Sequence, residues 1–549
     1  MRLPSIKDSA QQFNSLPTTR DMPLSHGLSS YHLKKNGKEG LVSVSSDLEA
    51  QVSASFSEGF IKVNQGQLSR PLPDDQRIQL DSKINSILTT RTAEQVFDQY
   101  ISHFAPKYPI VVFPPGATAA IVRENKPLLF LSILSIASVG YCTVAKQREL
   151  AIEVKNQLAD RAIVRGEKSL ELVQAFQVTS LWYRAPDEYR QMNLSQLVHI
   201  TTTMAIDLGL DKIDVSKPAA TAQESRGRVE LQRAWLGCFL LSASFSLILR
   251  RPNLTFWTAK LDDYLANLQQ TKAEATDEFL CNLVATERLC HDINQELFLS
   301  DPVRSLSRQD PKTLLIIQGF QDRNDSLSLV QLHSLQKAIV QFGRFASSLY
   351  AHELALHVNN NIDEFTAPFF AKSLKTCKFV DSNASHRSML RIIVIASRGL
   401  LDTFLGLSVS DMLALPPHIY GGRVIYAVVI LMKIHKTITQ SGKETSESIP
   451  LEELHLEAYL EQLVAISKLL IAKDERSALS RAFLIMPQLM GWFYLYWSRR
   501  PSGADESEIT EDLLTKNSKG QGSSASQAPT GTFGGDDWFA EFFNVEMLG

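Results

Sequence analysis

The chain has 549 residues, of which 44% are hydrophobic and 21% are charged, as is ordinary for a soluble globular protein. Its net charge of −3 excludes a basic field that would draw the whole molecule onto nucleic acid. Its five cysteines are scattered and odd in number, which excludes a disulfide-stapled secreted scaffold and favours a reducing compartment.

The N-terminal residues, 1–80, are rich in Ser, Gln, Asp and Gly, and their hydrophobic residues follow no sustained period. Such a composition cannot bury enough apolar surface to offset the entropy cost of folding. We therefore expect a weakly structured, disordered N-terminal segment. A small basic cluster, Lys34, Lys35 and Lys38, is typical of a solvated loop, although it also fits part of a nuclear import signal.

Helical periodicity begins after residue 80. Thr92–Phe104 is interpreted as a helix capped by Thr92, because its hydrophobic residues recur at three- and four-residue spacing. A proline-rich stretch at 105–116 follows. Since proline fixes φ and removes a backbone donor, this stretch predicts a rigid connector. The helical pattern resumes at Thr118–Glu124.

The stretch Pro127–Ala145 has no charged residue over 19 positions, which reaches the length of a membrane-spanning helix. It also contains several serines and Gly140, and it stands next to amphipathic segments. We therefore predict a helix buried inside an all-α domain, with a membrane span as the alternative interpretation.

Four further stretches show a helical period: Arg148–Arg165, Ser169–Arg184, Gln191–Leu208 and Val229–Leu249. Gly209 follows the third of them and is expected to end that helix in the left-handed conformation. Residues 212–227, between the third and the fourth, are interpreted as a polar linker.

A later helix is expected to start at Pro450, because proline suits the first helical position and Glu452 and Glu453 suit the positive end of the helix dipole. One face of that helix would carry Leu456, Tyr459, Leu460, Leu463, Ile466 and Leu470. No stretch alternates polar and apolar residues for long enough to form a sheet. The sequence thus predicts an all-α fold, with one large multi-helix domain at residues 81–500 between disordered N- and C-terminal segments.

The composition changes again at residue 501. Residues 501–549 contain nine acidic residues and two lysines, and they end in aromatic residues interspersed with acids: Trp538, Phe539, Phe542 and Phe543. This spacing is that of a short amphipathic helix, which can stay disordered alone and fold in the groove of a partner. We predict that the four aromatic residues bind a partner as an activation segment. The alternative is a C-terminal tail without a function.

The chain carries no familiar catalytic signature. A P-loop, a dinucleotide-binding glycine motif and a G-x-S-x-G elbow are absent from the sequence. His352 and His357 come closest to a zinc-protease pair, but they are five positions apart and would not share a helix face, so we interpret them as ordinary helix histidines. Cys281 and Cys290 lack metal-ligand spacing and are expected to be buried as small hydrophobic side chains. We expect no enzyme, no cofactor and no metal site.

Two adjacent blocks, Ser169–Asp211 and Glu230–Pro252, resemble the middle homology region of fungal zinc-cluster transcription factors. In that family, one helix pair ends in a motif like A-x-D-L-G-L, and the next helix opens with an arginine and an aromatic residue and ends near G-R-P. The matching residues here are Ala205, Asp207, Leu208, Gly209, Leu210, Arg233, Trp235, Arg250, Arg251 and Pro252. Arginine stands at position 250, where the family usually has glycine.

Residues 109–138 and 407–431 are similar to one branch of that family, which includes regulators of secreted proteases, acid-stress response and secondary-metabolite gene clusters. The resemblance implies an all-α regulatory domain. Trp182, Tyr183 and Trp235 are expected in its core, because large aromatic side chains mainly serve packing; the alternative is that they line a ligand-binding site. The resemblance also implies a nuclear regulator of a metabolic or secondary-metabolite gene set. Its helical domain would control activity or form homo- or heterodimers, and its tail would recruit a transcriptional coactivator.

Members of that family hold zinc in a six-cysteine cluster that binds DNA, and the five cysteines here match no such cluster. The resemblance therefore implies direct DNA contact only if a zinc cluster is encoded upstream, and otherwise contact through a DNA-binding partner. Two other interpretations stay open: an α-helical biosynthetic enzyme, and a membrane-associated helical scaffold that uses residues 127–145.

Overall fold

The computed structural model describes residues 73–497, except for 187–190, 216–219, 302, 305, 328, 330–331, 358–360, 368, 370, 375–383 and 442–448. Every regular element in this part of the chain is a helix, and the strand-like pairings within it are two isolated bridges. The prediction of an all-α fold is confirmed. The first described helix begins at Asp74, inside the segment 1–80 that the sequence separates from the helical domain.

The N-terminal group of helices is built around one uncharged helix. In chain order, the described helices of this group are α2 (Asp74–Ile87), α3 (Thr90–Gln99), α4 (Ala119–Asn125), α5 (Pro127–Ala137), α6 (Val144–Ala159), α7 (Leu170–Leu181) and α8 (Leu194–Asp207). α5 packs against α2, α3, α4, α6 and α7, and all of its 11 residues are buried. It can be enclosed on every side because it carries no charge that would resist leaving water.

The uncharged run 127–145 does not form one long helix. α5 ends at Ala137, the chain turns at Gly140 with φ +86°, and Thr143 caps α6. The prediction of a buried helix is therefore confirmed for Pro127–Ala137. α9 (Ala222–Ile248) is the described helix that is long and apolar enough to cross a membrane, and 89% of its apolar stretch is buried inside the body, as in a core helix.

Two predicted helix starts are wrong by several residues. Thr89, and not Thr92, caps α3: its side-chain oxygen accepts a hydrogen bond from the amide of Thr92. Similarly, Thr221 accepts from the amide of Glu224 and starts α9 inside the expected polar linker. In both cases a threonine upstream of the hydrophobic period satisfies the free amides of the first turn, so the helix extends past its apolar residues.

The helix end predicted at Gly209 is confirmed. Gly209 has φ +74°, and its amide donates to the carbonyl of Ile206 at 2.8 Å. The predicted start at Pro450 is wrong: a short 3-10 turn occupies Leu451–Leu454, His455 takes φ +48°, and α18 begins at Leu456. The expected apolar face of that helix is buried apart from Ile466, which is half-buried.

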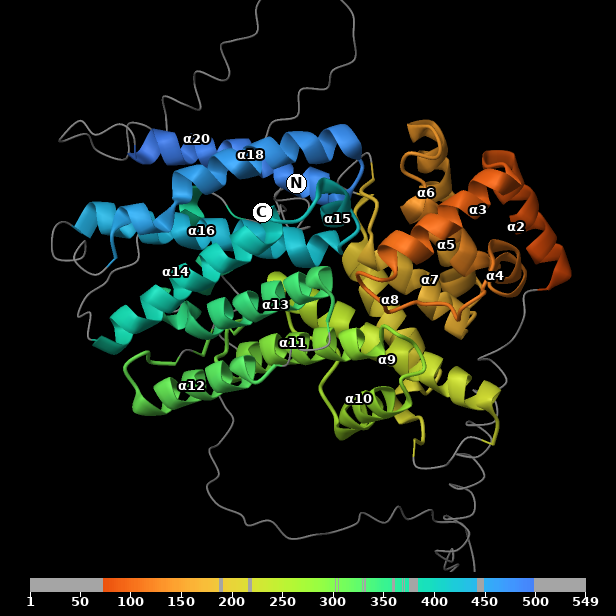
Figure 1. Ribbon diagram of the computed structural model, residues 1–549, viewed down its shortest axis with the longest axis horizontal. Helices are drawn as coiled ribbons and strands as arrows, with labels where there is room; N and C mark the ends of the chain where they lie inside the picture. The colour runs from red at the N-terminus through yellow and green to blue at the C-terminus, as the bar shows by residue number, and fades with distance from the viewer. Residues whose placement is uncertain are drawn as a thin grey trace, which may run out of the picture. The chain divides into compact units, whose positions relative to one another are not determined.

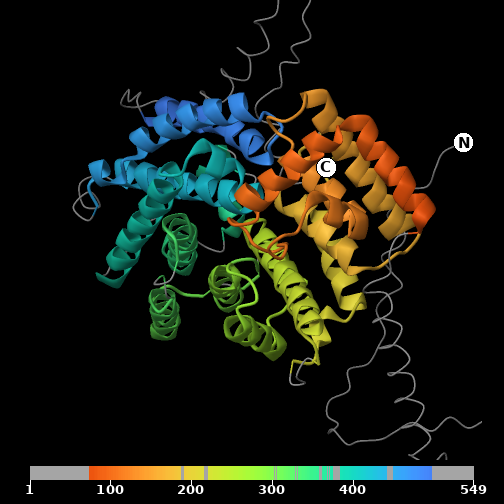
Figure 2. The same cartoon turned by 45° about the vertical axis from the view of Figure 1, so that its right-hand side comes forward.

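α9 connects the N-terminal group to the rest of the body. It packs against α7 and α8 on one side and against α10, α11 and α16 on the other, and it lies between the two groups in both views (Figure 1, Figure 2). The later described helices are α10 (Ala259–Thr271), α11 (Asp277–Glu296), α12 (Pro311–Asp325), α13 (Ser334–His352), α14 (Ala384–Leu405), α15 (Val409–Leu413), α16 (Pro417–Ser441), α18 (Leu456–Lys473), α19 (Ala478–Ala482) and α20 (Met486–Trp497).

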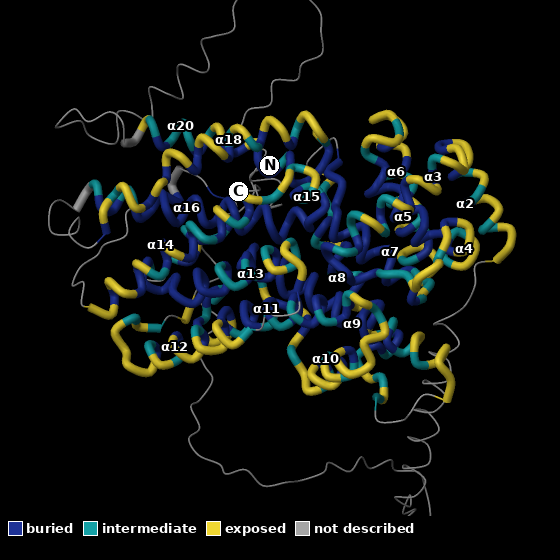
Figure 3. Tube along the Cα trace, in the orientation of Figure 1, coloured by how far each residue is buried: buried dark blue, intermediate teal, exposed yellow. Residues whose placement is uncertain are grey.

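These later helices stack on one another. α11 packs on α13, α13 on α14, α14 on α16, α16 on α18, and α18 on α20, so that α12 and α20 lie at opposite edges of the stack (Figure 1). Burial differs between these helices: α9 from Val229 onward and most of α16 are enclosed, whereas α10, α12 and α18 each expose one side (Figure 3). Two of the buried arginines described next, Arg233 and Arg423, lie on α9 and α16.

Candidate functional site

The C-terminal end of α9 places an arginine where the backbone favours glycine. The Arg250 amide donates to the Leu247 carbonyl and the Arg251 amide to the Ser246 carbonyl, at 3.1 and 2.8 Å. These two bonds form the helix-ending motif whose left-handed position is usually glycine. Arg250 occupies that position with φ +50°, at a cost of about 1–2 kcal/mol for a residue with a Cβ. The chain thus keeps the backbone geometry of the glycine in the resembled motif and adds a guanidinium group.

That guanidinium group is buried and pairs with a carboxylate. Arg250 forms an ion pair with Glu353, whose side chain is fully enclosed at the start of a 3-10 turn after α13. The Tyr426 hydroxyl donates to the same carboxylate, and the His357 Nε2 lies 2.9 Å from it. Burial alone would raise the pKa of Glu353, but Arg250, His357 and Tyr426 together hold the pKa below its usual range. Glu353 therefore stays ionised inside the body.

A second buried ion pair lies beside the first. Both carboxylate oxygens of Glu287 on α11 accept from the Arg423 guanidinium on α16, at 2.8 and 2.9 Å. The ring of Tyr350 on α13 lies under both arginines, with its centroid 5.4 Å from Arg250 and 5.9 Å from Arg423. Burial raises the pKa of Tyr350 to about 12. The two pairs thus join α9, α11, α13 and α16 through one aromatic ring.

Buried charges also fix the neighbouring helix contacts. Arg233, an arginine of the resembled motif, pairs with Asp277 at the start of α11 and donates to the Pro109 carbonyl at 2.9 Å. Arg184 pairs with Asp474 and so joins the end of α7 to the end of α18. Buried ion pairs add little net stability, but each is costly to break because one charge is then left alone. They therefore define which helices meet and at what register.

The spaces beside these charges are small. The cavity next to Arg250 measures about 10 Å³ and is lined by aromatic rings, including Tyr350 and Tyr426, which leaves room for a single water molecule. The Arg250 Nη1 has no hydrogen-bond partner among the described residues, and Arg250 is one of the residues that line this cavity. A cavity of about 70 Å³ lies beside Arg184 and Asp474, but these two groups neutralise each other. The geometry suits the positioning of helices rather than the conversion of a substrate.

The structure tests the predicted burial of several side chains. The core placement of the large aromatic residues and the burial of two cysteines are confirmed for Trp182, Tyr183, Trp235, Cys281 and Cys290. No group of three or more His, Cys, Asp or Glu side chains in the described part of the chain could hold a metal ion. The tail residues Trp538, Phe539, Phe542 and Phe543 lie outside the described residues, so the partner-binding assignment stays a prediction.

The two histidines of the weak zinc-protease match have different environments. His352 is buried at the end of α13, and its Nδ1 lies 2.7 Å from the Ser348 carbonyl, as expected of an ordinary helix histidine. For His357 that interpretation is wrong, because it lies beyond the helix and belongs to the Glu353 network. Sequence reasoning missed Glu353 itself. The signal that could have found it is Arg250, an arginine that directly follows a strongly apolar helix at a position where glycine is usual.

Comparisons with known proteins agree with this architecture. The model of the WAR1 C-terminal domain matches residues 61–464. Transcription factor pbcR of Emericella nidulans is 31% identical over 227 residues, which are 38% of this chain and 30% of that protein. Transcription factor himD of Aspergillus japonicus is 27% identical over 47% of this chain and 42% of its own length.

A third relative aligns over more of the chain. Transcriptional regulator WAR1 of Candida albicans is 22% identical over 362 residues, which are 64% of this chain and 36% of that protein. The chain therefore spans well under two thirds of the length of each of these relatives. No solved structure matches the chain. Because the family model covers most of the sequence, the chain belongs to the WAR1 C-terminal domain family, and its resemblance to the regulatory region of fungal transcription factors is confirmed.

Proposed function

We propose that this chain regulates transcription in the nucleus and controls a metabolic or secondary-metabolite gene set. The observation that carries the proposal is the match of residues 61–464 to the WAR1 C-terminal domain, together with relatives that are named transcription factors or regulators. The helical body would control the activity, and the acidic-aromatic tail at 501–549 would recruit a coactivator. DNA contact would come from a zinc cluster encoded upstream or from a DNA-binding partner.

The other two interpretations gain no support from the described residues. An enzyme would need an unpaired acid or base beside a space large enough for a substrate. The buried Glu353 and Glu287 are each ion-paired with an arginine, and the space beside Arg250 is water-sized. In a larger hollow of about 320 Å³, Asp81 is ion-paired with Arg123. A membrane scaffold would need an apolar helix that is open to lipid, whereas the apolar stretch of α9 is 89% buried. We therefore propose a non-enzymatic regulator that acts by contact.

The tail is tested by a reporter assay. The full chain and, separately, residues 501–549 are fused to a heterologous DNA-binding domain in a fungal host, and reporter expression is measured. Both fusions are expected to activate, and Trp538→Ala with Phe542→Ala is expected to remove most of the activation, because the aromatic anchors supply the contact area in a partner groove. Ser523→Ala with Ser524→Ala, in the same tail, is the matched control and is expected to keep it.

Two results would refute the tail assignment: no activation by either fusion, or activation that is equal in the aromatic and serine variants. Localisation is measured separately, with a fluorescent fusion of the full chain. Nuclear accumulation is expected, and exclusion from the nucleus would contradict the proposed function itself.

A further inference from the structure

α20 is an uncharged helix at the outer edge of the body. None of its 12 residues is charged, and it lies beside α18 in the last layer of the stack (Figure 1). Leu489 and Phe493 are buried against the body. The opposite side carries an apolar stripe, defined here as Leu484, just before the helix, with Pro487, Gly491 and Leu495. Leu484 and Leu495 are 45% and 40% exposed. A helix that is apolar on all sides is normally covered on all sides.

A glycine at the centre of the stripe is not required by any contact within the described part of the chain. A Cβ built on Gly491 would meet none of the described atoms within 4 Å. Glycine inside a helix costs about 1 kcal/mol relative to alanine. Its usual benefit is the close approach of another backbone or side chain, and here that approach is open only from outside. Gly491 thus forms a notch that another molecule can fill.

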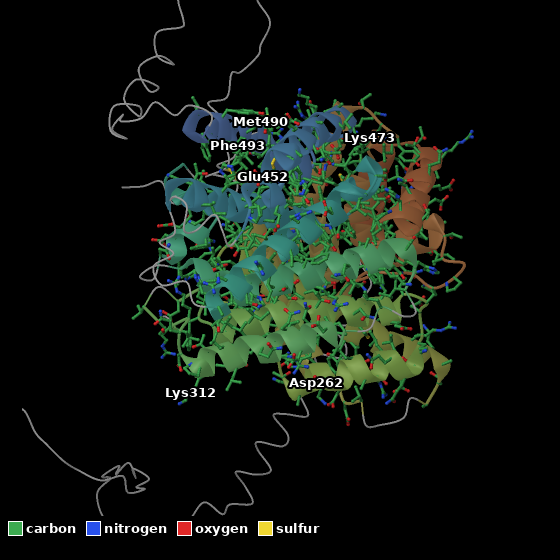
Figure 4. All side chains as sticks on the ribbon, turned by 60° about the vertical axis from the view of Figure 1, so that its left-hand side comes forward. Asp262, Lys312, Glu452, Lys473, Met490 and Phe493 are labelled. Carbon is green, nitrogen blue, oxygen red and sulfur yellow. The ribbon has the colours of Figure 1, made fainter. Side chains whose placement is uncertain are left out.

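The neighbouring helix carries charges of both signs beside this stripe. Glu461 and Lys468 are both exposed on α18, separated by seven positions. α18 and α20 run antiparallel, and the hydroxyl of Tyr494 donates to Glu457 at 2.9 Å, which fixes their register. Met490 and Phe493 lie at one end of this outer layer, and Lys473 lies at the other end (Figure 4).

The apolar and the charged positions share one centre. Leu484 and Gly491 are also seven positions apart. The hydrogen bond between Tyr494 and Glu457 places these two residues at the same level along the two antiparallel helices. Measured from that level, the midpoint between Leu484 and Gly491 and the midpoint between Glu461 and Lys468 differ by about one residue, or 1.5 Å of helix. A single two-fold axis through this level would therefore serve both pairs. Such an axis makes one surface complementary to itself.

We propose that the outer face of α18 and α20 binds a second copy of this chain. Around the two-fold axis, Leu484 packs into the notch at Gly491 of the partner subunit, and Glu461 lies opposite Lys468 of the partner subunit. Each contact occurs twice. The apolar stripe supplies the contact area, and the charge pairs fix the antiparallel orientation.

The charges decide between a second copy and the chain's own tail. Residues 501–549 hold nine acids against two lysines, so a tail lying on the stripe could pair with Lys468 but would bring its excess of acids beside the carboxylates of Glu457 and Glu461. A second copy presents a lysine to each Glu461. The observations therefore favour self-association, and coverage by the tail becomes an outcome of the test.

The test is the mass of the full chain in solution, measured by sedimentation over a range of concentrations. A dimer is expected. Glu461→Lys and Lys468→Glu, each on an exposed side chain, replace two attractive pairs by two repulsive ones and are each expected to weaken dimerisation roughly tenfold. Mixing the two variants is expected to restore dimers, because each altered position then faces an opposite charge. Rescue on mixing identifies the pairing of Glu461 with Lys468 across the two-fold axis.

The notch at Gly491 is tested by a separate variant with its own control. Gly491→Leu fills the space needed by Leu484 of the partner subunit and is expected to weaken dimerisation by roughly 100-fold, as for loss of a central contact. Gly319→Leu on α12, where a Cβ also meets nothing within 4 Å, is the control and is expected to dimerise normally. A monomer at every concentration, a dimer that none of the three variants affects, or a dimer that forms only after removal of 501–549 would overturn the proposal.

Discussion

Replacing Arg250 by methionine is expected to lower the free energy of unfolding by about 3–5 kcal/mol, because it leaves the Glu353 carboxylate buried without its counter-charge. Glu353 is fully enclosed, and its other partners include the hydroxyl of Tyr426 and the ring of His357. A hydroxyl can donate a hydrogen bond, but it carries no positive charge. The measurement is urea unfolding followed by circular dichroism, at neutral pH.

A double-mutant cycle separates the energy of the ion pair from the stability that is lost through changed packing. Glu353→Gln alone leaves Arg250 buried without a counter-charge, whereas Arg250→Met with Glu353→Gln leaves no buried charge from this pair. The double variant is therefore expected to lose less stability than the two single variants together, with a coupling energy of about 1–3 kcal/mol.

The matched control lies at the other end of α9. Arg228 pairs with Glu224 at 2.9 Å, and their side chains are 17% and 47% exposed, so Arg228→Met is expected to cost about 1 kcal/mol or less. If Arg250→Met cost no more than Arg228→Met, the Glu353 network would not be holding α9 against α13 and α16.

The parts of the fold that could be predicted are those that depend on neighbours in sequence. The apolar spacing of Pro127–Ala137 predicts a buried helix, and Gly209 predicts a left-handed helix end; both are confirmed because a helix period and a cap are local properties. Helix starts were less predictable. Thr89 and Thr92 both suit a cap, and the choice depends on how many turns the surrounding body accommodates.

The buried charge network could not be predicted from any period. Arg250 and Glu353 are 103 positions apart, and Arg423 and Glu287 are 136 apart. Such pairs depend on the order in which helices stack. A charged residue in an apolar stretch does not indicate which distant residue it will pair with. The prediction that His357 is an ordinary helix histidine failed for the same reason, because its environment is set by Glu353 and by the 3-10 turn between them.

Acidification is expected to destabilise the body through a histidine that has no acidic partner. His418 is buried at the start of α16, and neither ring nitrogen has a hydrogen-bond partner among the described residues. Burial, with a smaller contribution from the positive charge of Arg423, lowers the pKa of His418 to about 3. In the unfolded chain a histidine has a pKa near 6.5. Between these two values the unfolded chain binds a proton that the folded chain does not bind, so stability is lost as the pH falls through this window.

The expected size of this effect is about 2 kcal/mol of unfolding free energy between pH 7 and pH 5, from His418 alone. It is measured as the difference between the natural chain and His418→Gln, which cannot take up the proton, in urea unfolding at both pH values. His291 and His352 also have lowered pKa values because of burial, so both proteins will lose stability, and the natural chain should lose more. Equal losses in the two proteins would contradict the prediction, because they would mean that His418 takes up its proton without unfolding the body.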